Sequence, residues 1–426
     1  MVMIRFLFKG LMRDRARTLF PFLTVAIGVF LTVVMFGYIK GTETTVIQFN
    51  ADMLTGHVKV MTRGYADEAD RIPNDLALSG VEKLLRELKT TFPGTVWTPR
   101  IRFGGLLDVP DGRGETRAQG PVFGTAADIL TPGSAEVGRL GLSRSIARGR
   151  LPSRAGEILI GEVLADRLGI GPGETATLIG STMNGSMTTA NFTIVGIVRF
   201  GVQALDRMGL IMDLVDARAA LDMDDAAGEL LGFRTDGPYD RVFLDGLARE
   251  FNGNIAASAD EFTPVMRTLR DQSQLAVMLD MVGTVNGIVI AVFLLAMSLV
   301  LWNAGLIGSL RRYGEIGVRL AMGETKGHVY RTLLGEAVLI GTLGTIAGTA
   351  AGMAVTYYLQ EKGIDVSGFF KNAAVMIPSV IRSKVAPFGF VIGFIPGILS
   401  TIIGTAIAGR GVYKRQTASL FKELET

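Results

Sequence analysis

The sequence contains no cysteine and only two histidines, His57 and His328. The missing thiols exclude disulfide scaffolding, thiol catalysis and cysteine-ligated metal, and two distant histidines exclude a histidine-rich metal cluster. The chain also lacks the Gly-x4-Gly-Lys-Ser/Thr phosphate cradle, the His-Glu-x-x-His zinc motif and the Gly-x-Ser-x-Gly nucleophile turn. Neighbouring carboxylates such as Asp224 and Asp225 are typical of a solvated face. We therefore expect no catalytic residues, no metal site and no cofactor bound by this chain.

Charge is absent from four long apolar stretches, residues 19–39, 281–310, 337–360 and 385–409. Each exceeds the roughly 20 residues that a helix needs to cross a ~30 Å hydrocarbon core. Asn286 and Asn303 are the main strongly polar residues in these stretches. Proton relays and ion-coupled transport paths need buried ionisable groups, so a secondary transporter is disfavoured.

One apolar stretch therefore precedes a long soluble-looking region, and three follow it. This plan argues against a channel or a simple anchor. It predicts an α-helical membrane protein with four transmembrane helices in a 1 + 3 arrangement and a large α+β extracytoplasmic domain inserted between helices 1 and 2. The predicted segments are a cytoplasmic amphipathic helix (1–18), transmembrane helix 1 (19–41), the external domain with stalks (42–275), transmembrane helix 2 (276–310), a cytoplasmic loop (311–331), transmembrane helix 3 (332–360), a short external loop (361–384), transmembrane helix 4 (385–409) and a cytoplasmic tail (410–426).

The distribution of charge predicts the orientation. Residues 42–275 hold 24 basic and 31 acidic residues, whereas the rest of the chain holds 19 and 9. The basic residues of the three predicted cytoplasmic segments are Arg5, Lys9, Arg13, Arg15, Arg17, Arg311, Arg312, Arg319, Lys326, Arg331, Arg410, Lys414, Arg415 and Lys422. The positive-inside rule places these segments in the cytoplasm, although the loop 361–384 is mildly basic too. An acidic domain without clustered Lys and Arg argues against nucleic-acid binding.

The N-terminal segment mixes Phe6, Leu7, Leu11 and Met12 with basic residues. This pattern favours a short amphipathic helix on the inner membrane surface over a frayed basic terminus. A cleaved signal peptide is disfavoured because the apolar run is long and no small-x-small site precedes Lys40.

Within 42–275, strand-like and helix-like patterns alternate without an internal repeat. The predicted strands are 57–62, 95–103, 105–109, 157–160, 175–179, 192–198 and 210–212. The predicted helices are 81–89, 162–168, 216–221 and 239–251. We interpret 183–189 as a mobile hairpin tip. Residues 38–54 and 262–278 show helical patterns that predict rigid stalks next to the membrane, with simple loops as the alternative.

Glycines recur at four-residue spacing in the last three apolar stretches. They are Gly283 and Gly287, then Gly344, Gly348 and Gly352, and finally Gly389, Gly393 and Gly397. Such spacing places glycines on one helix face and allows another backbone to approach closely. Packing within the chain and pairing with a second subunit are both open. Pro396 predicts a kink in the fourth helix.

The strongest motif follows the second apolar stretch, where residues 311–323 read Arg-Arg-Tyr-Gly-Glu-Ile-Gly-Val-Arg-Leu-Ala-Met-Gly. It resembles the Arg-x-x-Glu-Ile-Gly-x-x-Arg-Ala-x-Gly signature of the FtsX-like permease family, which includes MacB-type exporters and lipoprotein-releasing LolC/LolE-type permeases. In that family the loop is a coupling helix that docks into a separate ABC ATPase. The resemblance implies ATPase-coupling roles for Arg311, Arg312, Glu315, Ile316, Gly317, Arg319, Gly323 and Lys326. On a helix, Ile316, Val318 and Leu320 would face a partner groove, and Glu315 would lie four residues from Arg319. A generic basic loop is the alternative.

The resemblance covers essentially the whole chain. Residues 149–151, 156–170, 173–174 and 192–198 resemble the family's periplasmic core, 335–337 its third helix, and 55–60 the LolC/LolE branch. The tail 417–424 lacks the family's proline, and Glu324 stands where a small residue is usual.

The resemblance implies a type VII ABC transporter fold in the bacterial inner membrane, with the large domain in the periplasm. Its partners would be two copies of a cytoplasmic ABC ATPase, which bind ATP and Mg²⁺, and a second permease subunit, identical or homologous. The expected activity is mechanotransmission that releases lipoproteins or related lipids. The alternatives are an FtsX-like regulator of a cell-wall hydrolase, an exporter of peptides or drugs, and a membrane-anchored enzyme.

Overall fold

Two units make up the residues that this computed structural model describes, namely 15–235, 239–255, 260–310, 313–365 and 380–414. The helical unit draws on Met1–Thr45, Met281–Ile364 and Val380–Thr426. The sheet unit draws on Val46–Asp280 and Asp365–Ser379. Most of the amphipathic helix predicted at 1–18 lies outside the described residues, as does most of the external loop.

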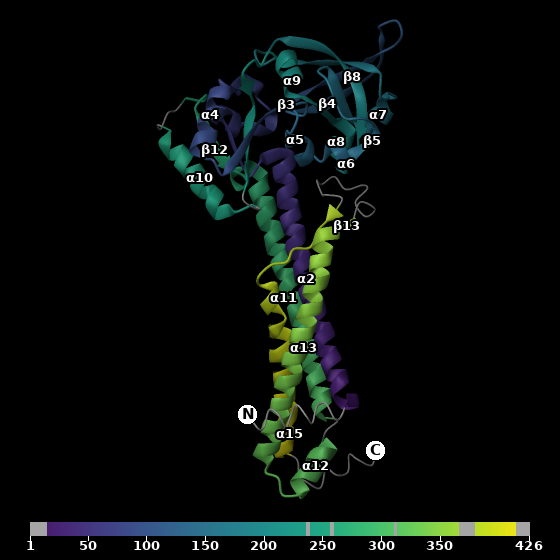
Figure 1. The fold of residues 1–426 in the computed structure, drawn as a ribbon, viewed down its shortest axis with the longest axis vertical. Helices are drawn as coiled ribbons and strands as arrows, with labels where there is room; N and C mark the ends of the chain where they lie inside the picture. The colour runs from purple at the N-terminus through teal and green to yellow at the C-terminus, as the bar shows by residue number, and fades with distance from the viewer. Residues whose placement is uncertain (1–14, 236–238, 256–259, 311–312, 366–379, 415–426) are drawn as a thin grey trace. The chain divides into compact units, whose positions relative to one another are not determined.

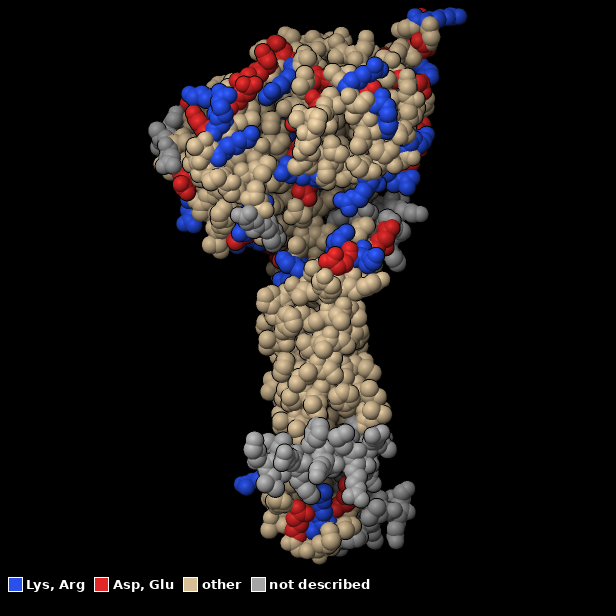
Figure 2. Space-filling model, in the orientation of Figure 1, with Lys and Arg blue, Asp and Glu red and all other residues tan. Residues whose placement is uncertain are grey.

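The helical unit consists of long helices that lie alongside one another (Figure 1). Its elements are α2 (Arg15–Asn50), α11 (Ser273–Leu310), α12 (Tyr313–Ala321), α13 (Lys326–Lys362), β13 (Ile364–Asp365), β14 (Val380–Ile381), α14 (Gly389–Ile392), η5 (Ile395–Ser400) and α15 (Thr401–Lys414). By length and composition, the candidate membrane spans among the described helices are Leu19–Thr55, Leu279–Gly308, Lys326–Lys362 and Gly389–Arg410. Figure 2 shows the visible face of these helices free of charged residues over much of its length, as a hydrocarbon environment requires.

The last of these spans is interrupted at the residue that the sequence singles out. Pro396 stands at the start of η5, a π-helical segment between α14 and α15. Proline has no N–H to donate and its ring crowds the preceding turn, so regular α-helical bonding cannot continue through it. The π-helical segment accommodates this break, and sharp bends in helices concentrate at such places.

The sheet unit is built on one ten-stranded sheet in the order β12–β1–β11–β3–β4–β9–β6–β8–β5, with β7 paired to β3 and β8. Its strands are β1 (Val58–Thr62), β3 (Thr95–Pro110), β4 (Thr116–Ala127), β5 (Ile146–Gly149), β6 (Glu157–Gly161), β7 (Thr175–Ser181), β8 (Met187–Val198), β9 (Gly209–Asp213), β11 (Glu229–Arg234) and β12 (Pro264–Thr268), beside a separate pair of β2 (Leu78–Ser79) and β10 (Ala226–Ala227). Its helices are η1 (Ala51–Thr55), α3 (Arg63–Asp67), η2 (Ala69–Arg71), η3 (Asn74–Leu76), α4 (Val81–Thr91), α5 (Glu136–Arg139), α6 (Leu142–Ser145), α7 (Glu162–Leu168), α8 (Gln203–Met208), α9 (Leu214–Leu221), α10 (Arg241–Asn254) and η4 (Leu269–Asp271).

Strand β3 joins the two halves of this sheet. The sequence predicts two strands here, 95–103 and 105–109, but the structure has one that continues through Gly104. Its first part pairs with β11 and its last part with β7, while β4 pairs with it from Ile101 onward. Gly104 and Gly105 favour a break between two strands when only the local sequence is considered. Continuous pairing with β4 keeps the strand extended through them.

Alternation along the central strands separates two cores. On β6, Ile158 and Ile160 belong to the main apolar cluster, and Leu159 belongs to a second cluster on the other side. Side chains of successive strand residues point to opposite faces, which explains why β6 is buried along its whole length.

The stalk predicted at 262–278 is wrong in its first part. Pro264–Thr268 forms the edge strand β12, which pairs antiparallel with β1, and α11 begins only at Ser273. Proline is tolerated on an edge strand, and short apolar runs do not separate helix from strand by periodicity alone. In the other predicted stalk, α2 continues to Asn50 and passes into the π-helical η1, which ends at Gly56 with φ 62°.

Candidate functional site

The predicted coupling motif forms the nine-residue helix α12 and the turn that follows it. Gly323 has φ 93°, the left-handed conformation that glycine adopts without steric penalty. Its N–H bonds the carbonyl of Leu320 at 3.1 Å, and the N–H of Glu324 bonds the carbonyl of Arg319 at 3.1 Å. These two bonds form a Schellman motif, which satisfies the last carbonyls of a helix. The motif glycine therefore ends α12 sharply before α13 begins at Lys326.

One predicted contact of α12 is wrong. Ile316 is not presented to a partner, because it is buried against Val329 and Leu333 of α13, with Leu320 packed beside it. Val318 is 42% exposed on the same helix. Burial of Ile316 stabilises α12 on the first turns of α13 by roughly 1.5–3 kcal/mol. The short helix is therefore packed against the long one.

The remaining motif residues differ in their exposure to solvent. Glu315 is exposed, Arg319 and Lys326 are half-buried, and Gly317 is buried. Arg311 and Arg312 lie outside the described residues. Glu324, the residue that departs from the family pattern, lies just before α13 and approaches His328 in the first turn of that helix at 3.5 Å.

The glycines of α13 decide how this helix packs. A Cβ at Gly344, Gly348 or Gly352 would lie within 3.0 Å of α2, closest at Gly348, where the Ala26 carbonyl oxygen is 2.4 Å away. A small-residue face of this kind allows two helix backbones to touch. Of the two interpretations left open by the sequence, packing within the chain therefore holds for α13.

The glycines of the last helix behave similarly, with one exception. A Cβ at Gly393 would lie 2.5 Å from Val29, and one at Gly397 would collide with the Thr345 hydroxyl. Gly389 has only ordinary contacts, with the Met353 sulfur 3.5 Å from the added atom.

The face of α11 that carries Gly283 and Gly287 has no partner among the described residues, since no atom lies within 4 Å of a Cβ added at either position. Large apolar side chains on the same helix are more than half exposed; they include Met281, Val285, Ile288, Val292 and Leu295. Neither glycine is needed for packing within the chain, so pairing with a second subunit stays a prediction for this face.

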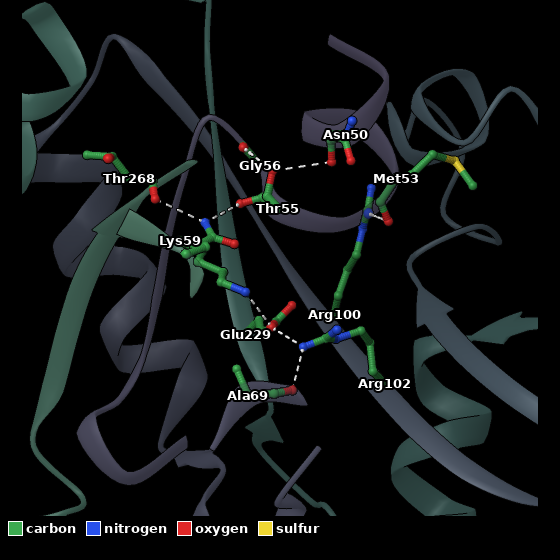
Figure 3. Close-up of polar contacts among 11 residues, drawn as sticks. Asn50, Met53, Thr55, Gly56, Lys59, Ala69, Arg100, Arg102, Glu229 and Thr268 are labelled. Atoms are coloured by element: carbon green, nitrogen blue, oxygen red, sulfur yellow. Dashed lines mark hydrogen bonds and ion pairs between the residues drawn. The ribbon is translucent and has the colours of Figure 1, made fainter. Parts of the chain in front are cut away.

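The sheet unit contains a buried ionic cluster that no sequence pattern indicated (Figure 3). Lys59 on β1 and Arg102 on β3 both donate to the same Glu229 carboxylate oxygen, at 2.8 and 2.7 Å. The Glu229 side chain is 1% exposed. Burial alone would raise its pKa, but the charges of Arg102 and Lys59 hold that pKa below its usual range. Residues 170 positions apart in sequence meet here, so no local motif could reveal the cluster.

A second buried cluster lies beside the first. Arg100 donates to Glu136 at 2.7 Å and to the backbone carbonyl of Met53 in η1 at 2.9 Å. Arg139 donates to the other oxygen of Glu136 at 2.8 Å and stacks over the Phe233 ring. The C-terminal end of the first membrane-associated helix is thereby tied to both β3 and α5.

Comparison with known proteins shows the family to which this chain belongs. The model of the MacB-like periplasmic core domain matches residues 18–257, more than half of the chain. The chain belongs to this family. A second model, the FtsX-like permease C-terminal domain, matches residues 287–417 and so covers the candidate coupling helix. Both matches agree with the resemblance inferred from the motif.

Individual relatives of this chain are distant. A Hyphomonas neptunium protein named macrolide export ATP-binding/permease protein MacB is 30% identical over 111 residues, 26% of this chain and 16% of that protein. The lipoprotein-releasing system transmembrane protein LolC of Xylella fastidiosa is 25% identical over 210 residues, 48% of each chain. The chain thus spans about half or less of the curated relatives that it matches. The solved periplasmic region of MacB from Actinobacillus actinomycetemcomitans aligns with 54% of this chain and 95% of its own, at 13% identity and a TM-score of 0.35.

Proposed function

We propose that this chain is the membrane (permease) subunit of a bacterial inner-membrane ABC complex, with four spans in the 1 + 3 arrangement and the sheet unit in the periplasm. Two cytoplasmic ATPase subunits would bind ATP and Mg²⁺, and two permease subunits, identical or homologous, would complete the assembly. ATP binding would draw the α12 helices together and shift the population of a bistable assembly.

The observation that carries this proposal is the mechanical connection of α12. Ile316 anchors α12 to α13, and the α13 glycines bring that helix into backbone contact with α2. Helix α2 then runs without interruption to Asn50, where η1 continues it to Thr55. A force applied at α12 would therefore pass through close-packed side chains and backbones, which deform little.

Lipoproteins or related lipids are the substrates that we propose. The support is the similarity to LolC, a lipoprotein-releasing protein, and the absence of ionisable residues from the apolar stretches. A chain without an intramembrane ion path fits a machine driven from outside the bilayer.

The test replaces Glu315 and Arg319 together with alanine. The variant should insert normally but retain less ATPase in a tagged pull-down from membranes, and it should lose ATP-dependent lipoprotein release. Glu82 and Arg86 on α4 form a matched control, since they are also a Glu and an Arg four residues apart, and both are exposed in the sheet unit. Equal losses of ATPase retention and lipoprotein release in both variants, or no loss in either, would contradict the assignment of α12 as the docking helix. An ATPase that co-purifies with a cell-wall hydrolase and no lipoprotein would replace release by regulation.

A further inference from the structure

One face of the sheet formed by β12, β1, β11 and β3 carries several basic side chains. Lys59 lies opposite Arg267 on β12, and Glu229 lies opposite Arg100 on β3. Alternate residues of a strand share a face, so Arg102 lies on the same side as Arg100. The opposite face carries apolar residues such as Val58 and Val60, which belong to the main core.

This face holds more buried positive than negative charge. Lys59 and Arg102 share one oxygen of Glu229, and their side chains are only 5% and 15% exposed. Arg100 forms its ion pair with a different carboxylate, that of Glu136, which also pairs with Arg139. The Nε of Arg102 is buried beside the Tyr65 hydroxyl and does not face solvent.

A pocket of about 530 Å³ opens over these two cations. Lys59 and Arg102 line it from the strands, and Asp67, Asp70, Arg267 and Asp271 line the remainder together with shorter polar and apolar side chains. The volume lies within the range of small-molecule sites. All the lining residues belong to the sheet unit.

The acidic residues of this pocket differ in their existing contacts. Asp271 accepts from the backbone N–H and the hydroxyl of Thr268, and Asp67 lies 4.0 Å from Arg267. Asp70 is exposed. Burial lowers the pKa of Lys59, and the carboxylates of Glu229 and Asp70 oppose that shift, which places Asp70 within electrostatic reach of the ammonium.

We propose that this pocket binds a small zwitterion of the phosphoethanolamine class, with its phosphate on Lys59 and Arg102 and its ammonium at Asp70. Guanidinium and ammonium donors together suit the several oxygens of a phosphate. The acidic residues at the pocket disfavour a polyanion, because like charges would face each other. The free ester and a lipid headgroup share this chemistry.

The site does not depend on the proposed transport function, because it needs neither ATP nor an ATPase. Its test therefore uses the purified full chain alone, in a neutral detergent free of phospholipid. Isothermal titration calorimetry compares phosphoethanolamine, glycerophosphoethanolamine, inorganic phosphate and ethanolamine. We expect phosphoethanolamine to bind about tenfold more tightly than inorganic phosphate or ethanolamine. Equal binding of glycerophosphoethanolamine points to a lipid headgroup, and its exclusion points to the free ester.

Three substitutions complete the experiment. Arg102→Gln leaves Lys59 and Glu229 paired one to one and should weaken phosphoethanolamine binding about tenfold, as should Asp70→Asn. Asp75→Asn removes a neighbouring exposed carboxylate that does not line the pocket and should leave binding unchanged. No binding to the wild-type chain, binding no tighter than that of inorganic phosphate, or wild-type affinity in Arg102→Gln or Asp70→Asn overturns the proposal. If Arg102→Gln does not fold, the affinity of Asp70→Asn for phosphoethanolamine tests the proposal, because the Asp70 side chain is on the surface and its replacement should not disturb folding.

Discussion

The guanidinium of Arg100 donates a 2.9 Å hydrogen bond to the carbonyl oxygen of Met53. Met53 lies in η1, at the end of the helical segment that begins with α2, where carbonyl groups lose their intrahelical partners. A fixed positive charge at this end also interacts favourably with the helix dipole. Arg100 is 2% exposed and reaches Glu136 with its Nε. One side chain therefore joins the end of the first helix to the sheet and to α5.

Replacing Arg100 with glutamine should destabilise the sheet unit by about 3 kcal/mol, because a buried ion pair is broken and the Met53 carbonyl loses its donor. Denaturant unfolding followed by tryptophan fluorescence measures this. A Trp302→Phe background leaves Trp97, in the sheet unit, as the only tryptophan. Arg117→Gln is the control, since its pair with Glu174 is about 43% exposed and should contribute at most ~1 kcal/mol. A similar small effect for both variants would contradict the assigned role of Arg100.

Gly348→Ala should destabilise the helical unit by about 1–3 kcal/mol, because the added Cβ would meet a backbone oxygen of α2 at 2.4 Å. Gly287→Ala should be neutral or slightly stabilising, since that position is open and alanine favours helix by up to ~1 kcal/mol. Thermal inactivation of the detergent-solubilised chain compares the two. If Gly287→Ala instead weakens self-association in crosslinking, the α11 face pairs with a second subunit. Equal stability of both variants would mean that α2 and α13 do not pack as described.

Gly323→Ala should loosen the end of α12, because a residue with a Cβ at φ 93° costs roughly 1–2 kcal/mol. We expect weaker ATPase retention in a pull-down from membranes, without loss of membrane insertion. Gly323→Asn is the matched variant, since asparagine tolerates left-handed conformations better. It should retain more ATPase than Gly323→Ala. The reverse order would show that the Schellman turn does not set the position of α12.

Acid should destabilise the sheet unit through His57. Burial lowers the pKa of His57 to about 4 from 6.5, assisted by the charges of Arg139 and Arg234. The unfolded chain then binds a proton between pH 6.5 and about 4 that the folded chain does not bind, so stability falls as the pH drops through this window.

The His57→Gln variant should lose this part of the pH dependence, and its amide oxygen can still accept the 3.1 Å hydrogen bond from the Arg234 N–H. Denaturation midpoints of the two proteins, measured across the window in the Trp302→Phe background, give the difference directly. His328→Gln controls for the loss of the other histidine. Parallel midpoint curves for wild type and His57→Gln would show that His57 is not held neutral in the folded chain.

Local patterns predicted much of this chain correctly. The helices 81–89 and 162–168 fall on α4 and α7, and the strands 157–160 and 175–179 fall on β6 and β7, because hydrophobic periodicity reports which face of a segment is buried. The same holds for the coupling motif, where Gly323 and the residues before it specify a helix end through bonds made within six residues.

Long apolar runs without charge and the motif at 311–323 were thus readable from the sequence, because hydrophobic length and turn chemistry are local properties. Only the tertiary structure decided the rest. In the tertiary structure Ile316 packs against α13, and the glycines of α13 pack against α2. Pro264–Thr268 is a strand because it pairs with β1. The tertiary structure also brings Lys59, Arg102 and Glu229 together from distant strands. Strand order and helix pairing set these contacts, and residues far apart in sequence carry no local signal of the neighbours that they will meet.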